Sequence, residues 1–318
     1  MIASRIILPI QLTHHASHLA LIELPERVAD QYRLYHAHGW CGYVSRELDS
    51  ADFESCLSDP VGLFNDDHVN RWIKKKRNLL AEVLWPGTNT AVILKKYQPR
   101  GAMNTLRLMQ GLPRAIRHWN NSWLLDSRGI QTPRPLFIAV PEKGRGQGLV
   151  ATTRIMNFVH IRDVFGRNSD AVDAVTVHGA EFEAREFARI CGRYVREIHD
   201  RGVVHRDLSG ANILVPECWS GRADNLAAAF CLVDVNRVRS VGAEGMTVQL
   251  RFQDLERLMV PESCVDEYFA GYAGDDQKIE LEKPRFLSYR HAYRRMRSAR
   301  NPIYRGLLKT FTYWPRTG

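Results

Sequence analysis

The chain has 318 residues, 45% of them hydrophobic, which is enough to bury a sizeable core and still carry extensions. Its 44 Lys and Arg against 35 Asp and Glu give a formal net charge of +9, and its six cysteines form no Cys-x-x-Cys pair. The cysteine pattern excludes a zinc ribbon and indicates a reducing compartment. The apolar run at residues 6–10 is too short for a signal peptide, and no segment reaches the length of a membrane-spanning helix, so we expect a cytoplasmic protein.

The first 65 residues contain no motif that indicates a function, and a lid, a docking element or an elaboration of the next domain are all compatible with them. Beyond them, the β-branched run at residues 91–95 predicts a strand that ends in Lys95. Residues 79–85 are its expected hairpin partner, across a Pro-Gly-Thr-Asn turn. Because successive strand residues point to opposite faces, Lys95 and Lys96 should lie on opposite sides of the sheet.

Two helices are predicted from apolar residues that recur at helical spacing. The first contains no Glu, since no acidic residue occurs between Val83 and Leu125. Its apolar face consists of Ile116, Trp119, Trp123 and Leu124. The second ends before Gly202, which we expect to cap it. Its apolar face consists of Phe187, Ile190, Cys191, Tyr194, Val195 and Ile198.

Residues 203–215 read Val-Val-His-Arg-Asp-Leu-Ser-Gly-Ala-Asn-Ile-Leu-Val and place His205, Asp207 and Asn212 between two β-branched runs. A second carboxylate, Asp234, follows another apolar run. If the run after Asn212 pairs with the run before Asp234 as an antiparallel hairpin, both side chains emerge at the same end, with Asp207 on the adjoining loop. Phosphoryl transfer from a nucleotide needs oxygen ligands for Mg²⁺ and a separate carboxylate that orients the attacking hydroxyl. The pattern therefore predicts a kinase.

These motifs resemble the protein-kinase-like superfamily, with its His-Arg-Asp-x-x-x-x-Asn loop and Asp-Phe-Gly triplet. The loop motif is intact from His205 to Asn212, whereas the triplet reads Asp234-Val235-Asn236 and has lost Phe and Gly. The string Asp-Val-Asn-Arg-Val-Arg, the Ser-Gly-Ala before Asn212 and the stretch Gly-Ile-Gln-Thr-Pro-Arg-Pro at 129–135 resemble the bacterial lipopolysaccharide kinases. Members of that family phosphorylate core sugars such as Kdo and heptose. The likeness covers roughly residues 68–275.

The resemblance implies an α+β, two-lobed protein-kinase-like fold with a small β-rich N-lobe and a larger helical C-lobe. We expect an N-terminal extension at residues 1–65, the N-lobe at 66–157, the C-lobe at 158–283 and a basic, aromatic tail at 284–318. The linker between the lobes, where adenine would bind, is expected near residues 154–160.

The resemblance also implies roles for the site residues. Asp207 would orient the acceptor hydroxyl and take its proton, and Asn212 and Asp234 would hold Mg²⁺. Lys95 is similar to the lysine of the Val-Ala-Ile-Lys strand and would contact the α- and β-phosphates of ATP. His205 would support the loop rather than take part in the chemistry.

Two further residues and one tripeptide are interpreted through the same resemblance. Asp254 is similar to the family's helix-start Asp, which accepts backbone N–H groups of the catalytic loop; an exposed Asp in a first helical turn is the alternative. Arg206 is expected to pair with an acidic side chain. The Val-Pro-Glu at residues 260–262 is similar to the Ala-Pro-Glu of protein kinases, but it follows the Asp254 helix, so we interpret it as coincidence.

Two departures from the family pattern leave room for a pseudokinase, a binding module without turnover. Residues 74–78 read Lys-Lys-Lys-Arg-Asn where a glycine-rich loop would cover the nucleotide. Their lysines could neutralise phosphates or could form a solvated hairpin tip. The glutamate that usually pairs with the strand lysine is missing, and Asp126 and Glu82 are the candidates to replace it.

Residues 284–318 hold nine Lys and Arg, no acidic residue and several aromatic residues, and they account for the whole net charge. Such a segment suits an anionic membrane surface, at about 1 kcal/mol per basic residue near it. Nucleic acid, whose bases stack on aromatic rings, and a packed helix with a solvated basic face are the alternatives. The family resemblance favours the membrane, because lipid A–core is anionic and is assembled at the inner membrane. We therefore expect the lipopolysaccharide core/lipid A glycolipid and that membrane surface as partners, and not nucleic acid.

Two other kinase classes share the loop motif. Small-molecule phosphotransferases of the aminoglycoside or choline type usually bind cationic substrates in acidic pockets, which the basic balance of this chain disfavours. A protein kinase is disfavoured because the glycine-rich loop and the Phe-Gly of the triplet are missing.

Overall fold

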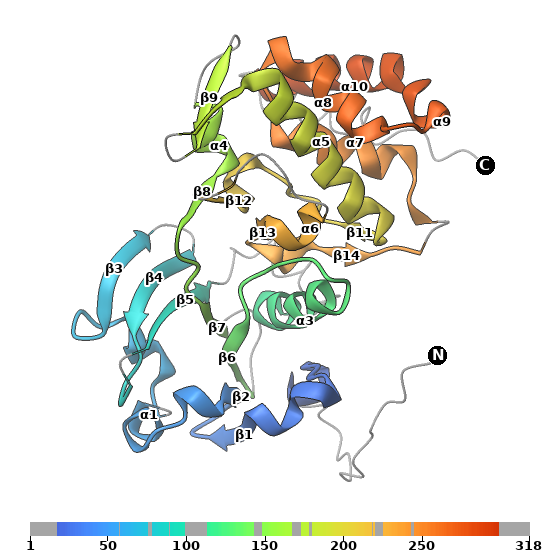
Figure 1. Ribbon diagram of the computed structural model, residues 1–318. Coiled ribbons are helices and arrows are strands. Elements are labelled where there is room, and N and C mark those ends of the chain that lie inside the picture. The colour runs from blue at the N-terminus through green and yellow to red at the C-terminus, as the bar shows by residue number, and fades with distance from the viewer. Residues whose placement is uncertain are drawn as a thin grey trace. The chain divides into compact units, whose positions relative to one another are not determined.

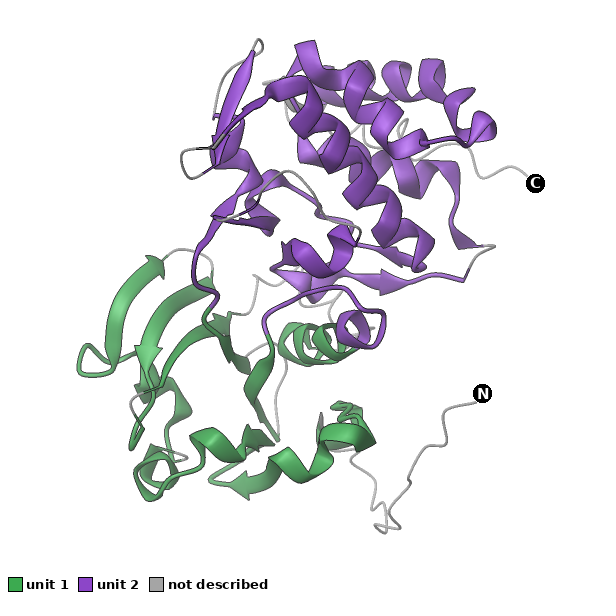
Figure 2. Cartoon of the chain, in the orientation of Figure 1, with its two compact units in different colours: residues 1–123, 134–154 green, residues 124–133, 155–318 purple. Residues whose placement is uncertain are grey.

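The computed structural model describes residues 18–56, 58–75, 78–88, 90–98, 113–142, 148–166, 173–177, 180–217, 219, 225–242 and 245–298 (Figure 1). The chain divides into two compact units, each made of two chain segments (Figure 2). Unit 1 comprises residues 1–123 and 134–154, and unit 2 comprises residues 124–133 and 155–318. The division next to Arg154 falls at the start of the stretch where the linker is predicted. The functional boundaries at residues 65, 157 and 283 stay predictions.

Unit 1 is built on a seven-stranded antiparallel sheet in the order β1-β2-β6-β7-β5-β4-β3. The strands are β1 (Tyr32–Ala37), β2 (Trp40–Ser45), β3 (Val69–Lys74), β4 (Asn78–Leu84), β5 (Ala91–Tyr97), β6 (Pro135–Pro141) and β7 (Gly148–Thr153). The predicted hairpin is confirmed, since β4 pairs with β5 from Asn78 opposite Tyr97 to Leu84 opposite Ala91. Residues 32–45, which carry no recognisable motif, form the β1–β2 edge of this sheet.

Apolar side chains cover both faces of this sheet. On one face, Phe53 of α1 (Ala51–Cys56) packs against Trp85 and Phe137, with ring centroids 5.1 and 5.5 Å away. On the other face lies the predicted helix, α3 (Arg114–Ser127), whose buried Trp119 belongs to the same apolar cluster as Ile138 and Val150. The alternation of β5 buries Leu94 in the first cluster and Tyr97 in the second.

Unit 2 is mainly helical, with short strands between the helices (Figure 1). Its helices are α4 (Ile161–Val164), α5 (Ala184–Asp200), α6 (Leu226–Ala229), α7 (Val248–Leu258), α8 (Val265–Ala273), α9 (Gln277–Glu280) and α10 (Lys283–Ser298). Its strands are β8 (Phe158–His160), β9 (Ala174–Val177), β10 (Ala180–Glu183), β11 (Val203–Val204), β12 (Ile213–Pro216), β13 (Cys231–Leu232) and β14 (Arg239–Ser240). The predicted α+β class, with one β-rich part and one helical part, is confirmed.

Helix α5 is the buried helix that the sequence predicts, and its whole apolar face is fully or almost fully buried. It ends where Gly202 adopts a φ of +70° and donates its N–H to the carbonyl of His199, as expected for a capping glycine. Two glycines allow α5 and α8 to approach closely. A Cβ on Gly192 would stand 2.0 Å from the Tyr268 carbonyl oxygen, and one on Gly271 would stand 2.0 Å from that of Arg189.

Replacing Gly192 with Ala is therefore expected to lower the free energy of unfolding by about 1–3 kcal/mol, because the added methyl group meets backbone atoms that cannot move independently. The higher helix propensity of Ala offsets only part of this loss. Urea unfolding of the purified variant would measure it. The control is Gly242→Ala, whose Cβ has no heavy atom within 4 Å and which should change stability by less than about 1 kcal/mol. Equal stability of the two variants would contradict the close approach.

The first part of the predicted tail is the packed helix α10. Its Phe286 is fully buried against Phe252 and Phe269, with ring centroids 5.5 and 5.2 Å away. Its Arg290 is 1% exposed and donates to a buried carboxylate, Glu256 Oε2, at 2.8 Å. Within residues 283–298 the packed-helix alternative is therefore confirmed. Residues 299–318, with the remaining basic and aromatic side chains, lie outside the described residues.

Candidate active site

The predicted site residues Asp207, Asn212 and Asp234 are brought together around the β12–β13 hairpin. Ile213 lies opposite Leu232, and Leu214 opposite Cys231, so the predicted antiparallel pairing is confirmed. Next to the Ile213–Leu232 pair, the N–H of Val233 donates to the carbonyl of Asn212 at 2.9 Å. Asn212 and Asp234 consequently flank the same end of the hairpin.

The stretch at 129–135 that resembles the lipopolysaccharide kinases lies in part along the same hairpin. The N–H of Leu232 donates to the Gln131 carbonyl, and Thr132 Oγ1 donates to the Leu232 carbonyl, both at 2.8 Å. Gln131 also donates its N–H to the Ala227 carbonyl at 2.8 Å. This segment therefore fixes the strand that leads to Asp234.

The loop around Asp207 is closed by its own hydrogen bonds. Asn212 Nδ2 and the N–H of Ser209 both donate to the Asp207 carbonyl at 2.8 Å, and the N–H of Asn212 donates to the Ser209 carbonyl at 2.7 Å. Because the Asn212 amide uses its nitrogen here, its oxygen is the atom available to a cation. His205 is fully buried, and its Nε2 lies 3.2 Å from the Val233 carbonyl, so it joins the loop to the hairpin as predicted.

Asp254 holds the start of this loop. Its Oδ2 accepts the N–H of His205 at 2.6 Å, and its Oδ1 accepts the N–H of Arg206 at 2.7 Å. The predicted role is confirmed, whereas the predicted helix-start position is wrong, because Asp254 is the seventh residue of α7. The exposed alternative is also wrong, since Asp254 is 1% exposed. Arg206 has a φ of +63°, a conformation that these two hydrogen bonds help to hold.

The protonation of Asp254 follows from its surroundings. Burial disfavours the charged carboxylate, but electrostatic interaction with the imidazole groups of His199, 3.5 Å away, and His205, together with the backbone N–H of His205, outweighs burial and holds the pKa of Asp254 below its ordinary value. A carboxyl group with a lowered pKa stabilises the folded state above its unfolded-state pKa, and this contribution is lost as the pH falls through the folded-state pKa.

Replacing Asp254 with Asn is accordingly expected to lower the free energy of unfolding at pH 7 by about 2–4 kcal/mol, since the amide group leaves a buried loop N–H without an acceptor. The difference from wild type should begin to narrow below about pH 4, where Asp254 of the unfolded wild-type chain takes up a proton while the folded carboxylate, with its lowered pKa, stays ionised. Urea unfolding at pH values from 7 to 3.5 would measure both quantities. A difference that stays constant over this range would contradict the ionised state of Asp254.

Two arginines that sequence reasoning missed contact the Asp207 carboxylate. Arg257 Nη1 lies 2.5 Å from Oδ1, and Arg237 Nη1 lies 3.1 Å from Oδ2. Arg237 lies within the Asp-Val-Asn-Arg-Val-Arg string and could have been suspected from it. Arg257 lies near the C-terminal end of α7, three residues beyond Asp254, and no local signal in the sequence connects it with Asp207.

Asp234 begins a short turn, with Val235–Arg237 in 3₁₀ conformation after it. Its φ of +57° and ψ of +44° are left-handed, a conformation that Asp tolerates better than most residues. Asn236 Nδ2 donates to Asp234 Oδ1 at 2.6 Å and so orients the carboxylate.

Asn212 and Asp234 offer the kind of oxygen atoms that a magnesium ion prefers. Mg²⁺ prefers oxygen ligands and usually takes one or two protein carboxylates together with substrate phosphates and water. In the described part of the chain, no group of three or more His, Cys, Asp or Glu side chains could hold a metal ion. One carboxylate and one amide oxygen are thus the ligands that this hairpin end offers.

Lys95 belongs to unit 1 and is 9% exposed in the middle of the sheet, where β5 pairs with both β4 and β7. Its Nζ lies 4.9 Å from the centre of the Tyr97 ring, so both side chains lie on the face that α3 covers. From this helix, His118 Nδ1 lies 2.7 Å from the Tyr97 hydroxyl.

Of the two candidates for the missing glutamate, Glu82 lies on the face of the sheet that carries Lys95. Leu80 lies opposite Lys95, and Glu82 lies two residues further along β4, which makes it a diagonal neighbour. Its buried carboxylate accepts from Asn70 Nδ2 at 2.5 Å and pairs with Arg154 Nη1 at 3.1 Å. Asp126 lies in the part of α3 that belongs to unit 2.

The turn expected to cover the nucleotide joins β3 to β4, and residues 76 and 77 within it lie outside the described residues. In the described part, Lys75 Nζ lies 4.3 Å from the centre of the Trp72 ring. This contact is compatible with both predicted alternatives, a phosphate-neutralising turn and a solvated tip.

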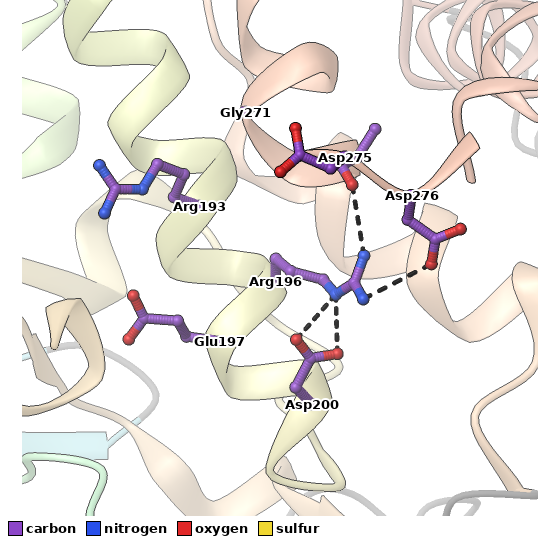
Figure 3. A pocket seen from close by; sticks show the side chains of 9 residues that line it. Arg193, Arg196, Glu197, Asp200, Gly271, Asp275 and Asp276 are labelled. Atoms are coloured by element: carbon purple, nitrogen blue, oxygen red, sulfur yellow. Dashed lines mark hydrogen bonds and ion pairs between the residues drawn. The ribbon is translucent and has the colours of Figure 1, made fainter. Parts of the chain in front are cut away.

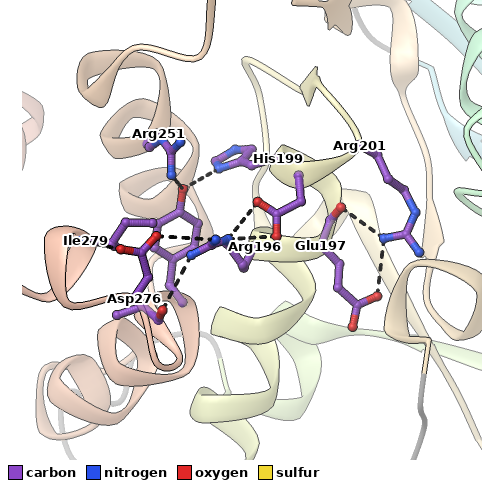
Figure 4. A network of polar contacts seen from close by, with 10 residues as sticks. Arg196, Glu197, His199, Arg201, Arg251, Asp276 and Ile279 are labelled. Carbon is purple, nitrogen blue, oxygen red and sulfur yellow. Dashed lines mark hydrogen bonds and ion pairs between the residues drawn. The ribbon is translucent and has the colours of Figure 1, made fainter. Parts of the chain in front are cut away.

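A pocket of about 360 Å³ lies in unit 2 between α5 and the end of α8 (Figure 3). Arg196 crosses it and pairs with Asp200 at 2.7 Å and Asp276 at 3.6 Å. The same polar network reaches the buried His199, whose Nδ1 lies 2.8 Å from the Tyr272 hydroxyl (Figure 4). None of the predicted site residues lines this pocket.

A comparison with protein-family models defines the class of this α+β protein: it is a kinase, that is, a phosphotransferase. The chain matches the model of the "Lipopolysaccharide kinase (Kdo/WaaP) family" over residues 77–267, more than half of its length. It therefore belongs to this family and is a lipopolysaccharide kinase.

One solved structure similar to this chain is described as "WaaP in complex with acyl carrier protein". The two share 15% sequence identity, the match covers 73% of this chain and 94% of that chain, and the TM-score is 0.47. Comparison with curated protein sequences gives no significant match.

Proposed function

We propose that the protein transfers the γ-phosphoryl group of ATP, in a reaction that requires Mg²⁺, to a hydroxyl group of a Kdo or heptose residue in the lipopolysaccharide core. The observation that carries this proposal is the hydrogen-bonded loop that joins Asp207 and Asn212 beside Asp234. Family membership supplies the acceptor class.

Each residue has a defined part in the proposed reaction. Asp207 orients the acceptor hydroxyl and accepts its proton as the oxygen attacks the γ-phosphorus and ADP leaves with the electrons of the broken P–O bond. Asn212 and Asp234 would hold Mg²⁺, and the bound ion would supply positive charge that offsets the negative charge of the phosphates. Lys95 contacts the α- and β-phosphates, with Glu82 as the acidic residue on its face of the sheet.

We further propose that the protein acts as a peripheral protein at the cytoplasmic face of the inner membrane. No helix in the described ranges is long and apolar enough to cross a membrane. Exposed basic residues on α10, such as Arg285 and Arg295, favour an anionic surface. Lipid A–core glycolipid at that surface is the expected acceptor, and nucleic acid is the competing partner.

The pseudokinase is the second candidate, and the helix without a glutamate is the observation that favours it. A pseudokinase would bind ATP and the membrane without turnover. Catalysis is favoured because Asp207, Asn212, Asp234 and Lys95 are all present.

The test is phosphate transfer from γ-labelled ATP with Mg²⁺ to a panel of truncated lipopolysaccharide cores, with casein, aminoglycosides and buffer as controls. Label in the glycolipid is expected, and the shortest core that accepts it identifies the sugar. Label in casein or an aminoglycoside alone would assign another kinase activity. ATP binding with no label in any acceptor would establish the pseudokinase.

A further inference from the structure

Two cationic side chains from different elements contact the carboxylate of Asp207. Arg257 of α7 contacts Oδ1, and Arg237 of the turn after Asp234 contacts Oδ2. Two guanidinium groups around one carboxylate leave a net charge of +1 beside the proposed base. A site that binds only a neutral sugar hydroxyl does not need this excess of positive charge.

The two ion pairs of Asp207 are more exposed to solvent than the buried ion pairs of unit 2. The side chains of Arg257 and Asp207 are about a third exposed, whereas Arg290 and Glu256 of the α10–α7 pair are almost completely buried. Exposed ion pairs contribute little to stability, about 0–1 kcal/mol, and can therefore change partners at small cost. The two arginines can thus exchange their contact with Asp207 for a contact with a bound ligand.

Each arginine also has N–H donors that do not contact Asp207 and can bind a second anion. A guanidinium has five N–H donors in a planar fork, and each one gives Asp207 only an Nη1 contact. The remaining donors match a carboxylate or a phosphate, which guanidinium groups bind in bidentate fashion.

The two arginines come from different elements and are expected to meet different partners. Arg237 follows the proposed metal ligand Asp234 by three residues in the same turn, so the metal-bound nucleotide is its expected partner. Arg257 comes from α7, the helix that holds the catalytic loop through Asp254, and it contacts the other carboxylate oxygen. Because its element carries no proposed metal ligand, the acceptor is the expected partner of Arg257.

We propose that Arg257 binds an anionic group, a carboxylate or a phosphate, carried by the acceptor sugar next to the hydroxyl that Asp207 orients. This inference rests on the proposed function and makes Arg257 a specificity-determining residue for an acidic acceptor. Binding of the acceptor anion draws the guanidinium from Asp207 Oδ1 and frees that oxygen for the hydroxyl proton.

The test compares Arg257→Gln with wild type on core oligosaccharides that retain their acidic groups and on the same oligosaccharides after phosphatase treatment and carboxyl reduction. The variant should raise KM for the acidic acceptor by about 10- to 100-fold, leave KM for ATP unchanged, and not alter KM for the neutralised acceptor. Arg257→Lys should show an intermediate effect, since it keeps the charge but loses the fork. Arg193→Gln, which removes one exposed positive charge from α5, is the matched control and should match wild type.

A second readout does not depend on turnover. Calorimetric titration with the acidic oligosaccharide should show binding to wild type and at least about 10-fold weaker binding to Arg257→Gln. A rise in KM for ATP, or equal losses on both acceptors, would overturn the proposal and assign Arg257 to the nucleotide or to the position of Asp207. If wild type transfers no phosphate but binds the acidic oligosaccharide through Arg257, the proposed function fails while the assignment of Arg257 stands.

Discussion

Replacement of Asp207 by Asn is expected to reduce phosphoryl transfer by about 10²- to 10⁴-fold, the usual contribution of a positioned general base. Asn has nearly the same shape but cannot accept the hydroxyl proton. Its effect on stability should be less than about 1 kcal/mol, because the lost ion pairs to Arg237 and Arg257 are partly exposed. Initial rates with γ-labelled ATP and urea unfolding of the same preparation would measure both.

The control for Asp207→Asn is Asp200→Asn. Asp200 lies at the end of α5, is half exposed and pairs with Arg196, so the variant makes the same change in charge within unit 2. Its rate should equal that of wild type. Retained turnover in the Asp207 variant would remove this residue from the mechanism, and loss of folding would mean that the rate does not report on catalysis.

Replacement of Asp234 by Asn is expected to lower the rate by about 10³-fold at millimolar Mg²⁺, because a metal contributes several kcal/mol of transition-state stabilisation. Asn tolerates the left-handed conformation at this position and can still accept from Asn236, so the turn should remain intact. What the variant loses is the negative charge that attracts the cation.

The signature of Asp234→Asn is therefore a changed dependence on metal concentration. Rates measured over a range of Mg²⁺ concentrations should show half-saturation at a much higher concentration than in wild type, with partial recovery of activity. The Asp207 variant should show no such recovery. An unchanged half-saturation concentration would mean that Asp234 does not bind the metal.

The features that could be predicted from the sequence depend on local signals. The β4–β5 and β12–β13 hairpins, α3 and α5 were all predictable, because apolar periodicity and turn residues act within a few positions of the chain. The contact of Asp254 with the loop was predictable only through family resemblance, since 48 and 49 residues separate the partners.

Other features depend on partners that are distant in the sequence. Residues 32–45 read as a stretch without a motif, yet β2 pairs with β6, about a hundred residues later. Arg290 reads as one cation of a basic tail, yet it is buried because Glu256 and the Val260 carbonyl surround it. Sequence patterns do not specify such pairings, which depend on how whole elements pack.

By itself, the sequence predicted the chemistry: Asp207, Asn212 and Asp234 stand at spacings that bring the proposed oxygen ligands and the proposed base to one end of a hairpin. It also determined the periodic helices and strands, since their apolar faces must leave water. Only the tertiary structure decided the charge around that base. Arg237 and Arg257 lie 30 and 50 residues beyond Asp207 in the chain, and their electrostatic effect on it depends on distance in space, which packing alone sets.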